Sequence, residues 1–201
     1  LARDLGAGRI SGEVAPGVVV VAAPPDVSPR LVLRALERWP DAERVVVIMG
    51  SGFGTTCEVV DELASAGEKV GVAVVRLYRP FPTGELLDAL PTTVRRIAVL
   101  DRTKEPGSPA EPLHQDVVLA LTADPGRFEH GQPLVIGGRY GLSSKEYTPA
   151  MAGAVFAELA ADRPKPRFTV GITDDVTHLS LAVHDEHRIA PRSLGAVFYG
   201  Y

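Results

Sequence analysis

Hydrophobic residues along the chain form short continuous runs, and most runs are followed by a segment with apolar residues at helical spacing. The clearest runs are residues 45–49, 70–75, 97–100 and 134–136. Continuous apolar runs are typical of strands buried on both faces, and amphipathic segments between them are typical of covering helices. The pattern therefore predicts an α/β protein, with three α/β/α layers around a mostly parallel sheet.

Helix boundaries are marked by residues with known preferences for helix ends. Thr55 or Thr56 is expected to cap the helix after the first of these strands, and Gly67 to end it. Thr148 before Pro149 is a strong signal for the start of the last helix. Further helices are expected at residues 31–39 and 84–90, and at a segment whose apolar face is Val117, Val118, Leu119 and Leu121.

Composition divides the chain into three regions. Residues 1–30 are rich in Gly, Pro and Ala around one extended stretch at 18–21, which predicts an N-terminal arm or interdomain linker. Residues 31–163 form the α/β domain. Residues 164–201 turn polar again, with a strand expected at 168–172 and a loop at 173–178, and are interpreted as a linker and the first strand of a following domain. We expect the chain to be a piece of a longer protein.

Charge and cysteine content exclude several classes. A formal charge of −4 argues against a nucleic-acid binder, which needs clustered basic residues. No apolar run approaches the roughly 18–20 residues of a membrane-spanning helix, and the start of the chain lacks the layout of a secretory signal. We therefore expect no membrane partner and a cytoplasmic location. With Cys57 alone, this chain cannot form an internal disulfide or hold an iron–sulfur cluster.

The glycine-rich turn at Gly50, Gly52 and Gly54 is the main candidate for a ligand site. It joins a strand to a helix start, where free backbone N–H groups and the helix dipole favour anions, so Thr55 and the three glycines are candidate cofactor-binding residues. A dinucleotide fingerprint has its third glycine one place later and an acidic residue after the second strand, and this chain has neither. A structural turn is the favoured interpretation, and a bound phosphate or nucleotide is the alternative.

Charged loops follow two of the predicted strands, and a third lies near the C-terminal end. Each is either a site or a solvated or interface loop, and we favour contact with other domains. The candidate contact residues are Asp101, Arg102, Lys104, Glu105, Arg139, Tyr140, Lys145, Asp174 and Asp175. The acids and bases after the strand at 97–100 are expected to neutralise one another, and Gly137 and Gly138 to permit close approach of the chain.

No metal site and no catalytic residue are assigned. A metal site at Asp174, Asp175 and His178, or at the second polar cluster 184–187, is conceivable, but adjacent residues rarely point at one ion. Cys57 lies in a first helical turn that could lower its pKa, yet a buried filler is the favoured interpretation.

Five blocks of sequence, taken together, resemble the pyruvate:ferredoxin (or flavodoxin) oxidoreductase family. They are residues 67–72, 75–81, 96–107, 137–150 and 168–178, and they occur in the family's order. The core resembles the family's second domain, which is similar to the C-terminal domain of transketolase. The resemblance implies a multidomain enzyme that decarboxylates pyruvate on thiamine diphosphate, passes electrons through iron–sulfur clusters to ferredoxin or flavodoxin, and delivers an acetyl group to coenzyme A.

The same resemblance implies that this region carries none of the cofactors itself. The thiamine diphosphate with its magnesium, the clusters and the main coenzyme A contacts belong to other domains in such enzymes. The resemblance therefore implies a structural domain, inactive by itself, whose partners are the other domains and subunits of the oxidoreductase. A stand-alone nucleotide- or coenzyme A-binding module that uses residues 50–56 is the competing hypothesis.

Overall fold

The computed structural model describes residues 18–21, 41–76 and 78–184, with side chains from residue 41 onward. The helix expected at 31–39 lies outside the described residues, as do the strand expected after Ser193 and residues 185–187 of the second polar cluster.

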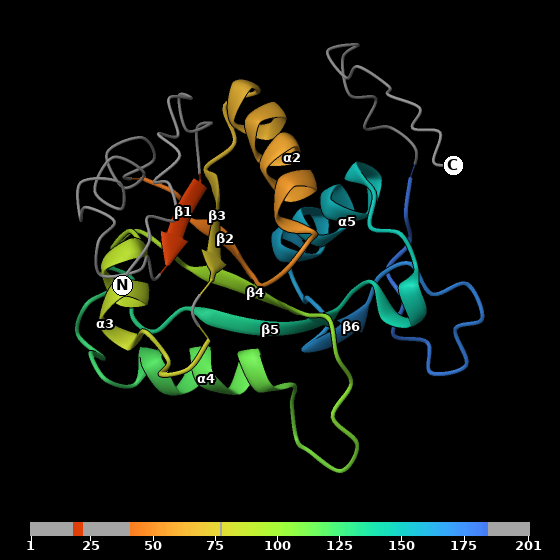
Figure 1. The fold of residues 1–201 in the computed structure, drawn as a ribbon. Coiled ribbons are helices and arrows are strands. Elements are labelled where there is room, and N and C mark those ends of the chain that lie inside the picture. Colours follow the sequence, from red (N-terminus) through yellow and green to blue (C-terminus); the bar gives the residue numbers. More distant parts are fainter. Residues whose placement is uncertain (1–17, 22–40, 77, 185–201) are drawn as a thin grey trace, which may run out of the picture.

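The centre of the structure is a six-stranded sheet with the order β1-β3-β2-β4-β5-β6 (Figure 1). Every pair of neighbouring strands is parallel. The strands are β1 (Val18–Val21), β2 (Arg44–Ile48), β3 (Val70–Val75), β4 (Arg96–Asp101), β5 (Leu134–Arg139) and β6 (Arg167–Thr169). The predicted parallel sheet is confirmed, although β5 is longer than expected and β6 is shorter.

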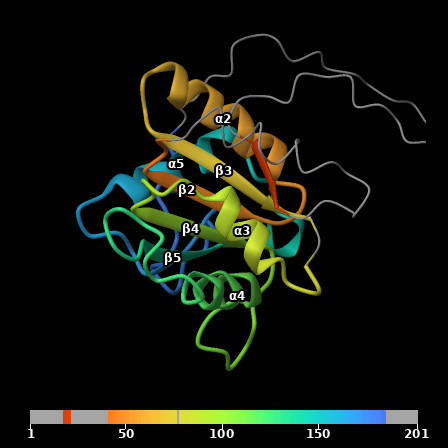
Figure 2. The same ribbon diagram turned by 90° about the vertical axis from the view of Figure 1, so that its left-hand side faces the viewer.

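Helices cover both faces of the sheet, which confirms the three-layer prediction (Figure 2). One face carries α2 (Phe53–Ser65) and α5 (Pro149–Ala160), and the other carries α3 (Thr83–Ala89) and α4 (Pro112–Leu121). A short 3-10 helix, η1 (Leu142–Ser144), follows β5.

Alternate residues of each strand enter different cores because side chains alternate across a sheet. In β2, Val46 and Ile48 pack with α2 and α5, whereas Val45 and Val47 pack with α3 and α4. Both sets are fully buried. This two-sided burial explains why the strands appear in the sequence as continuous apolar runs.

Two of the predicted helix boundaries are confirmed. The Thr148 side chain accepts a hydrogen bond from the Met151 backbone N–H at 3.3 Å and caps α5. Gly67, with φ +89°, follows the end of α2, and the Glu68 N–H bonds the Leu63 carbonyl at 3.0 Å. A left-handed residue at this place is the usual way to satisfy the last carbonyls of a helix.

Two other helix predictions are wrong. Helix α2 is capped by neither Thr55 nor Thr56, because it begins at Phe53 after an N-cap at Gly52 that has no side-chain cap. Val118 and Leu119 lie 39% and 69% exposed and are not part of the buried face of α4. That face is formed by residues at helical spacing, namely Leu113, Val117, Ala120 and Leu121.

The β5–α5–β6 unit has the opposite hand to the others. The β4–α4–β5 and β5–α5–β6 units progress in the same direction along the sheet, but their helices lie on opposite faces. The β2–α2–β3 and β3–α3–β4 units share the hand of β4–α4–β5, and parallel crossovers are right-handed in about 98% of cases. With this hand, α5 lies on the same face as α2, packs beside it, and helps to cover β2 and β4 on that face.

Both flanking regions contribute a strand to the sheet. β1 lies within the region interpreted as an arm and pairs with β3. β6 lies beyond residue 163 and pairs with β5, and Phe168, Val170 and Leu181 are buried in the core next to α2 and α5. The division of the chain at residues 30 and 163 remains a prediction.

Candidate functional site

The carboxyl edge of the sheet is where open parallel sheets bind their ligands, at the point where the strand order reverses. In this sheet that point lies between β2 and β4. From β2 the chain moves to β3 on one side, and it then crosses to β4 on the other side of β2. Three connections meet there: the glycine turn after β2, the charged loop after β4, and the segment after β5. These connections contain most of the residues that the sequence singles out.

The glycine turn is a close-packed elbow. Gly50 has φ +95°, a conformation that favours glycine. A Cβ at Gly52 would lie 2.7 Å from the Tyr140 ring and 3.0 Å from the Tyr147 ring. A Cβ at Gly54, in the first turn of α2, would meet nothing within 4 Å. Only the first two glycines are therefore required by the geometry of the turn.

Two tyrosine rings pack against the turn from the segment after β5. Tyr140 is buried, and its hydroxyl donates to the Met49 carbonyl at 2.6 Å. The rings of Tyr140 and Tyr147 lie 4.9 Å apart, and the Tyr147 hydroxyl is 3.4 Å from Thr56 Oγ1. Burial raises the pKa of both tyrosines. Side chains of the domain therefore take the space that a ligand group would need next to Gly52.

Thr55 and Thr56 offer little to a ligand in this arrangement. Thr55 is half-buried within α2. Thr56 is fully buried, and its hydroxyl donates to the Gly52 carbonyl at 2.9 Å. Together with the packed rings, this supports the structural interpretation of the glycine turn.

Arg102 links the turn after β2 to the segment after β5. Its Nη1 donates to Ser51 Oγ at 2.7 Å, and its Nε donates to the Gly141 carbonyl at 3.4 Å. These contacts of Arg102 therefore differ from the expected neutralisation by Asp101 or Glu105. The guanidinium spans the position where the crevice of a ligand-binding sheet would open.

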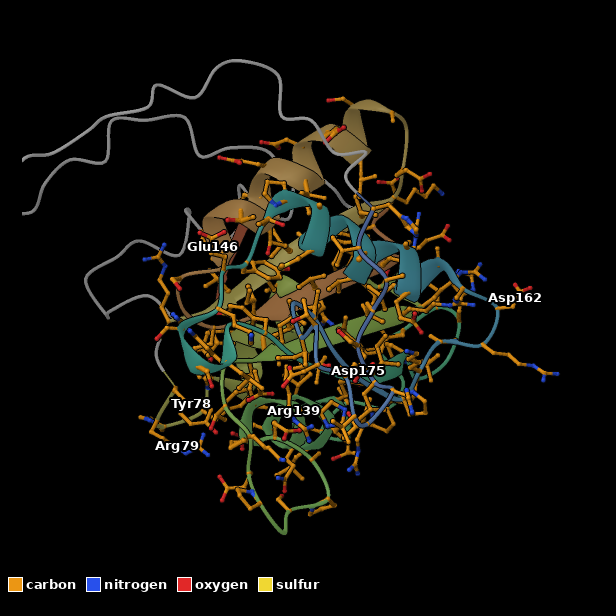
Figure 3. The ribbon with its side chains drawn as sticks, turned by 90° about the vertical axis from the view of Figure 1, so that its right-hand side faces the viewer. Tyr78, Arg79, Arg139, Glu146, Asp162 and Asp175 are labelled. Carbon is orange, nitrogen blue, oxygen red and sulfur yellow. The ribbon has the colours of Figure 1, made fainter. Side chains whose placement is uncertain are left out.

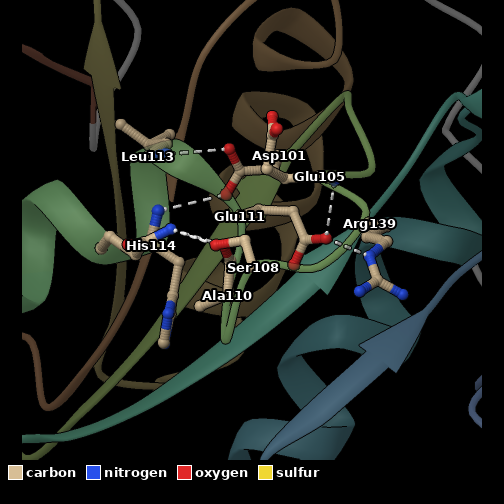
Figure 4. A network of polar contacts seen from close by, with 9 residues as sticks. Asp101, Glu105, Ser108, Ala110, Glu111, Leu113, His114 and Arg139 are labelled. Atoms are coloured by element: carbon tan, nitrogen blue, oxygen red, sulfur yellow. Dashed lines mark hydrogen bonds and ion pairs between the residues drawn. The ribbon is translucent and has the colours of Figure 1, made fainter.

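The Asp101 side chain lies at the start of α4 and caps that helix (Figure 4). Its two carboxylate oxygens accept the backbone N–H groups of Leu113 at 3.0 Å and His114 at 3.2 Å. Burial raises the pKa of Asp101 to about 6, although these two hydrogen bonds oppose the rise. The contact found for Asp101 is thus internal, at the first turn of a helix whose dipole favours a carboxylate.

Arg139 forms a largely buried ion pair that the sequence analysis missed. Its Nε lies 2.6 Å from Glu111 Oε1, and Glu111 is itself buried (Figure 4). The same Glu111 oxygen accepts the Glu105 backbone N–H at 3.5 Å. Glu111 directly precedes Pro112, the first residue of α4, and this helix-start signal could have drawn attention to it.

His114 lies beside this network and was also missed. Both ring nitrogens are buried without a hydrogen-bond partner among the described residues. Burial lowers the pKa of His114, and the nearby charge of Arg167 lowers it further. The ring packs on the backbone of β5, since a Cβ at Gly137 would lie 3.2 Å from it. The next residue of β5, Gly138, leaves room for the Phe168 ring, which a Cβ at this position would overlap.

The remaining contact candidates lie at the surface. Lys104, Glu105 and Lys145 are exposed in the loops after β4 and β5. Asp174 is exposed as well, whereas Asp175 accepts hydrogen bonds from the Leu179 and Ser180 N–H groups at 3.1 and 2.9 Å (Figure 3). Burial tends to raise the pKa of Asp175, but these hydrogen bonds outweigh it and the pKa is lowered. Asp175 therefore shapes its own loop.

A small cavity of about 400 Å³ lies on the other side of the glycine turn, at the ends of β2 and β3. It is lined by Met49, Gly50, Phe53, Val74, Val75 and Arg76. The Arg76 guanidinium lies 5.8 Å from the centre of the Phe53 ring. The side chains that line the cavity are apolar apart from this one exposed cation.

The described residues do not fit the cofactors of a thiamine-dependent oxidoreductase. No group of three or more His, Cys, Asp or Glu side chains within them is arranged to hold a metal ion such as the magnesium of a diphosphate. Cys57 is buried, burial raises its pKa to about 12, and one thiol cannot ligate a cluster. The interpretation of Cys57 as a filler is confirmed. None of the helices in the described part of the chain is long and apolar enough to span a membrane.

Comparison with known proteins gives a consistent result. Residues 42–140 match the family model for the core domain II of pyruvate:ferredoxin oxidoreductase. The chain is 59% identical over 165 residues to a probable pyruvate-flavodoxin oxidoreductase of Escherichia coli, and 55% identical over 154 residues to the pyruvate:ferredoxin oxidoreductase of Moorella thermoacetica. It is 51% identical over 147 residues to the mitochondrial pyruvate dehydrogenase [NADP(+)] of Euglena gracilis.

These relatives are much longer than the chain. The matches cover 80%, 76% and 73% of this chain, but 14%, 13% and 8% of the respective relatives. The similarity therefore concerns one domain of each relative.

Proposed function

Because residues 42–140 of this chain belong to the pyruvate:ferredoxin oxidoreductase family as its core domain II, we propose that the chain is a structural, interdomain-packing domain of a pyruvate:ferredoxin or pyruvate:flavodoxin oxidoreductase. The parent enzyme oxidatively decarboxylates pyruvate to acetyl-CoA and passes the electrons to ferredoxin or flavodoxin. This domain supplies no catalytic residue to that reaction.

One observation carries the structural role: the ligand position of the fold is filled by the domain's own side chains. Tyr140 and Tyr147 pack against Gly52, and Arg102 bonds Ser51 across the crevice between β2 and β4. A phosphate at the start of α2 would have to displace both kinds of contact. The fold thus keeps the architecture of a ligand-binding sheet without an open site at its switch point.

Thiamine diphosphate with magnesium, the iron–sulfur clusters and the main coenzyme A contacts then belong to other parts of the parent enzyme. The poor fit of the described residues to a metal, a diphosphate or a cluster supports this assignment. The partners of the domain are the other domains and subunits of the same oxidoreductase, and ferredoxin or flavodoxin meets the enzyme as a whole. Nucleic acid is not a partner, and the cytoplasm is the proposed location.

Two measurements test the proposal. Titration of the purified 201-residue chain with thiamine diphosphate, coenzyme A and NAD should give no binding heat at up to about 1 mM ligand, the weak end of specific affinity. The full-length oxidoreductase that contains this domain should reduce flavodoxin or ferredoxin when given pyruvate and coenzyme A, and the chain alone should not. Pyruvate-dependent electron transfer by the chain alone would overturn the proposal.

A stand-alone nucleotide- or coenzyme A-binding module at residues 50–56 is not favoured by the geometry. Binding beside Gly52 requires movement of the Tyr140 ring, whose hydroxyl bonds the Met49 carbonyl at 2.6 Å. Micromolar binding of any of the three ligands in the same titration would revive the module hypothesis and contradict ours.

A further inference from the structure

The outer face of α4 carries two adjacent exposed large apolar side chains, a pair that no other segment of the described residues shows. We define this outer face by Gln115, Asp116, Val118, Leu119 and Thr122, the last at the C-cap. Val118 and Leu119 are 39% and 69% exposed. The other large apolar side chains exposed among the described residues are single ones on separate segments, namely Leu134, Val176 and Val183.

Each polar residue on the outer face of α4 has at least one partner within the domain. The Gln115 amide donates to Ser108 Oγ at 2.8 Å and to the Ala110 carbonyl at 2.6 Å. Asp116 pairs with Arg79 at 2.8 Å, and the Thr122 hydroxyl donates to the Leu119 carbonyl at 2.6 Å. These hydrogen bonds and the ion pair would remain in place if the face were covered, which lowers the cost of burying it.

Helix α2, on the opposite face of the sheet, shows the ordinary pattern (Figure 1). Its exposed positions include two carboxylates, Glu58 and Glu62. A helix whose outer face is charged is solvated, whereas a helix that is apolar on all sides is usually buried in a larger structure. Helix α4 lies between these two cases, because its outer face carries Val118 and Leu119 beside three polar residues, and its one acid is paired with Arg79.

We propose that the outer face of α4 docks against another domain of the same oxidoreductase through an apolar contact centred on Leu119. This inference rests on the proposed function, and it places the contact on a helix face instead of on the charged loops. The occupant follows from size and charge. The chain covers 13–14% of its flavodoxin- and ferredoxin-linked relatives, so most of such a polypeptide lies outside this domain. With its one acid paired to Arg79, the face offers nothing to a nucleic acid or an anionic membrane.

Thiol labelling tests the contact directly. Leu119→Cys places a thiol at the centre of the outer face, and Ser65→Cys places a matched thiol at the exposed end of α2, on the opposite side of the sheet. Cys57 gives little background because it is buried. Each variant is made in the 201-residue chain and in the full-length oxidoreductase, and maleimide labelling is followed by mass spectrometry of the peptide that contains the new cysteine.

We expect position 119 to be labelled at least about tenfold more slowly in the full-length protein than in the chain, as protection by a stable contact requires. Position 65 should be labelled at the same rate in both. Equal rates at position 119 would overturn the proposal. Protection of position 119 in the chain itself, with a concentration-dependent mass in sedimentation, would identify a second copy as the occupant and would also overturn it.

The same full-length variants separate this inference from the proposed function. Activity of the full-length protein with pyruvate, coenzyme A and flavodoxin, together with an accessible position 119, would reject the docking face and leave the family role intact. A protected position 119 in a protein without this activity would reject the reaction and leave the interface intact.

Discussion

Gly52 and Gly54 lie two residues apart in one turn but differ in their surroundings. Gly52→Ala pushes a methyl group into the Tyr140 and Tyr147 rings, and overpacking of this kind costs about 1–3 kcal/mol. Gly54→Ala adds a methyl group to open space inside α2, where alanine is favoured over glycine by about 0.5–1 kcal/mol. Urea unfolding of both variants should therefore show opposite changes in the free energy of unfolding. Equal destabilisation by the two substitutions would contradict the packing described for the turn.

Asp101 makes stability depend on pH. Its pKa is raised from 3.8 to about 6 by burial, so the folded state holds a proton there that the unfolded chain has already lost. This contribution is fully present below about pH 4 and is lost as pH rises towards 6. Relative to Asp101→Asn, the wild type should thus lose on the order of 1–2 kcal/mol between pH 4.5 and 6.5.

Denaturant unfolding of the wild type and Asp101→Asn, measured at half-unit steps across this range, checks the effect. His114, whose lowered pKa makes the fold lose stability as pH falls below 6.5, is present in both proteins and largely cancels in the difference. Parallel pH profiles would show that the Asp101 carboxyl titrates normally in the folded chain.

At this scale the sequence indicates where residues lie better than what they do. The position of Asp101 at the end of a strand was predictable, but its capping of α4 depends on how the loop brings Pro112 back to the sheet. The packing that favours an elbow over a phosphate cradle comes from Tyr140, which is far from the turn in sequence and reaches it only through the strand order. No local pattern contains that information.

Among the helices, the start of α5 offers a direct test of a sequence signal. Thr148→Ala removes the acceptor of the Met151 N–H, and loss of such a cap costs about 1 kcal/mol. Ser65→Ala, at the other end of a helix, removes only an exposed hydroxyl contact to the Asp61 carbonyl and should stay within about 0.5 kcal/mol of the wild type. Thermal unfolding of both variants measures the difference. A cost for Ser65→Ala as large as for Thr148→Ala would show that the cap has no special role.

Element positions were predicted well where burial on both faces gives long apolar runs, as in β2, β3 and β4. The prediction was less accurate where one side of an element is open. The outer residues Val118 and Leu119 were assigned to the buried face of α4 because hydrophobicity alone does not separate a core contact from an exposed apolar patch. The extension of β5 through Gly137 and Gly138 was obscured by glycines, which usually indicate turns.

For the whole molecule, the end of the folded unit can be tested by truncation. Phe168, Val170 and Leu181 lie beyond residue 163 but are buried in the core shared with α2 and α5. Each large apolar side chain that loses its burial costs about 1.5–3 kcal/mol, and together they approach the 5–15 kcal/mol that stabilises an ordinary domain. A chain ending at residue 163 should therefore unfold at much lower urea concentration than one ending at residue 184.

Circular dichroism and urea titration of the two truncated chains decide this point. Equal midpoints would support a domain that closes at residue 163, as composition suggested. A large difference would move the boundary past Leu181.

Tyr140 joins two strands that are not neighbours, since it follows β5 while its hydroxyl holds the carbonyl at the end of β2, with β4 between them. Together with Arg102, it works as a cross-brace along one edge of the sheet. A displacement of the segment after β5 would therefore also displace the start of α2, because these contacts couple the two. A rigid edge of this kind loses little conformational entropy when another domain packs against it. The domain can therefore hold neighbouring domains in a fixed orientation.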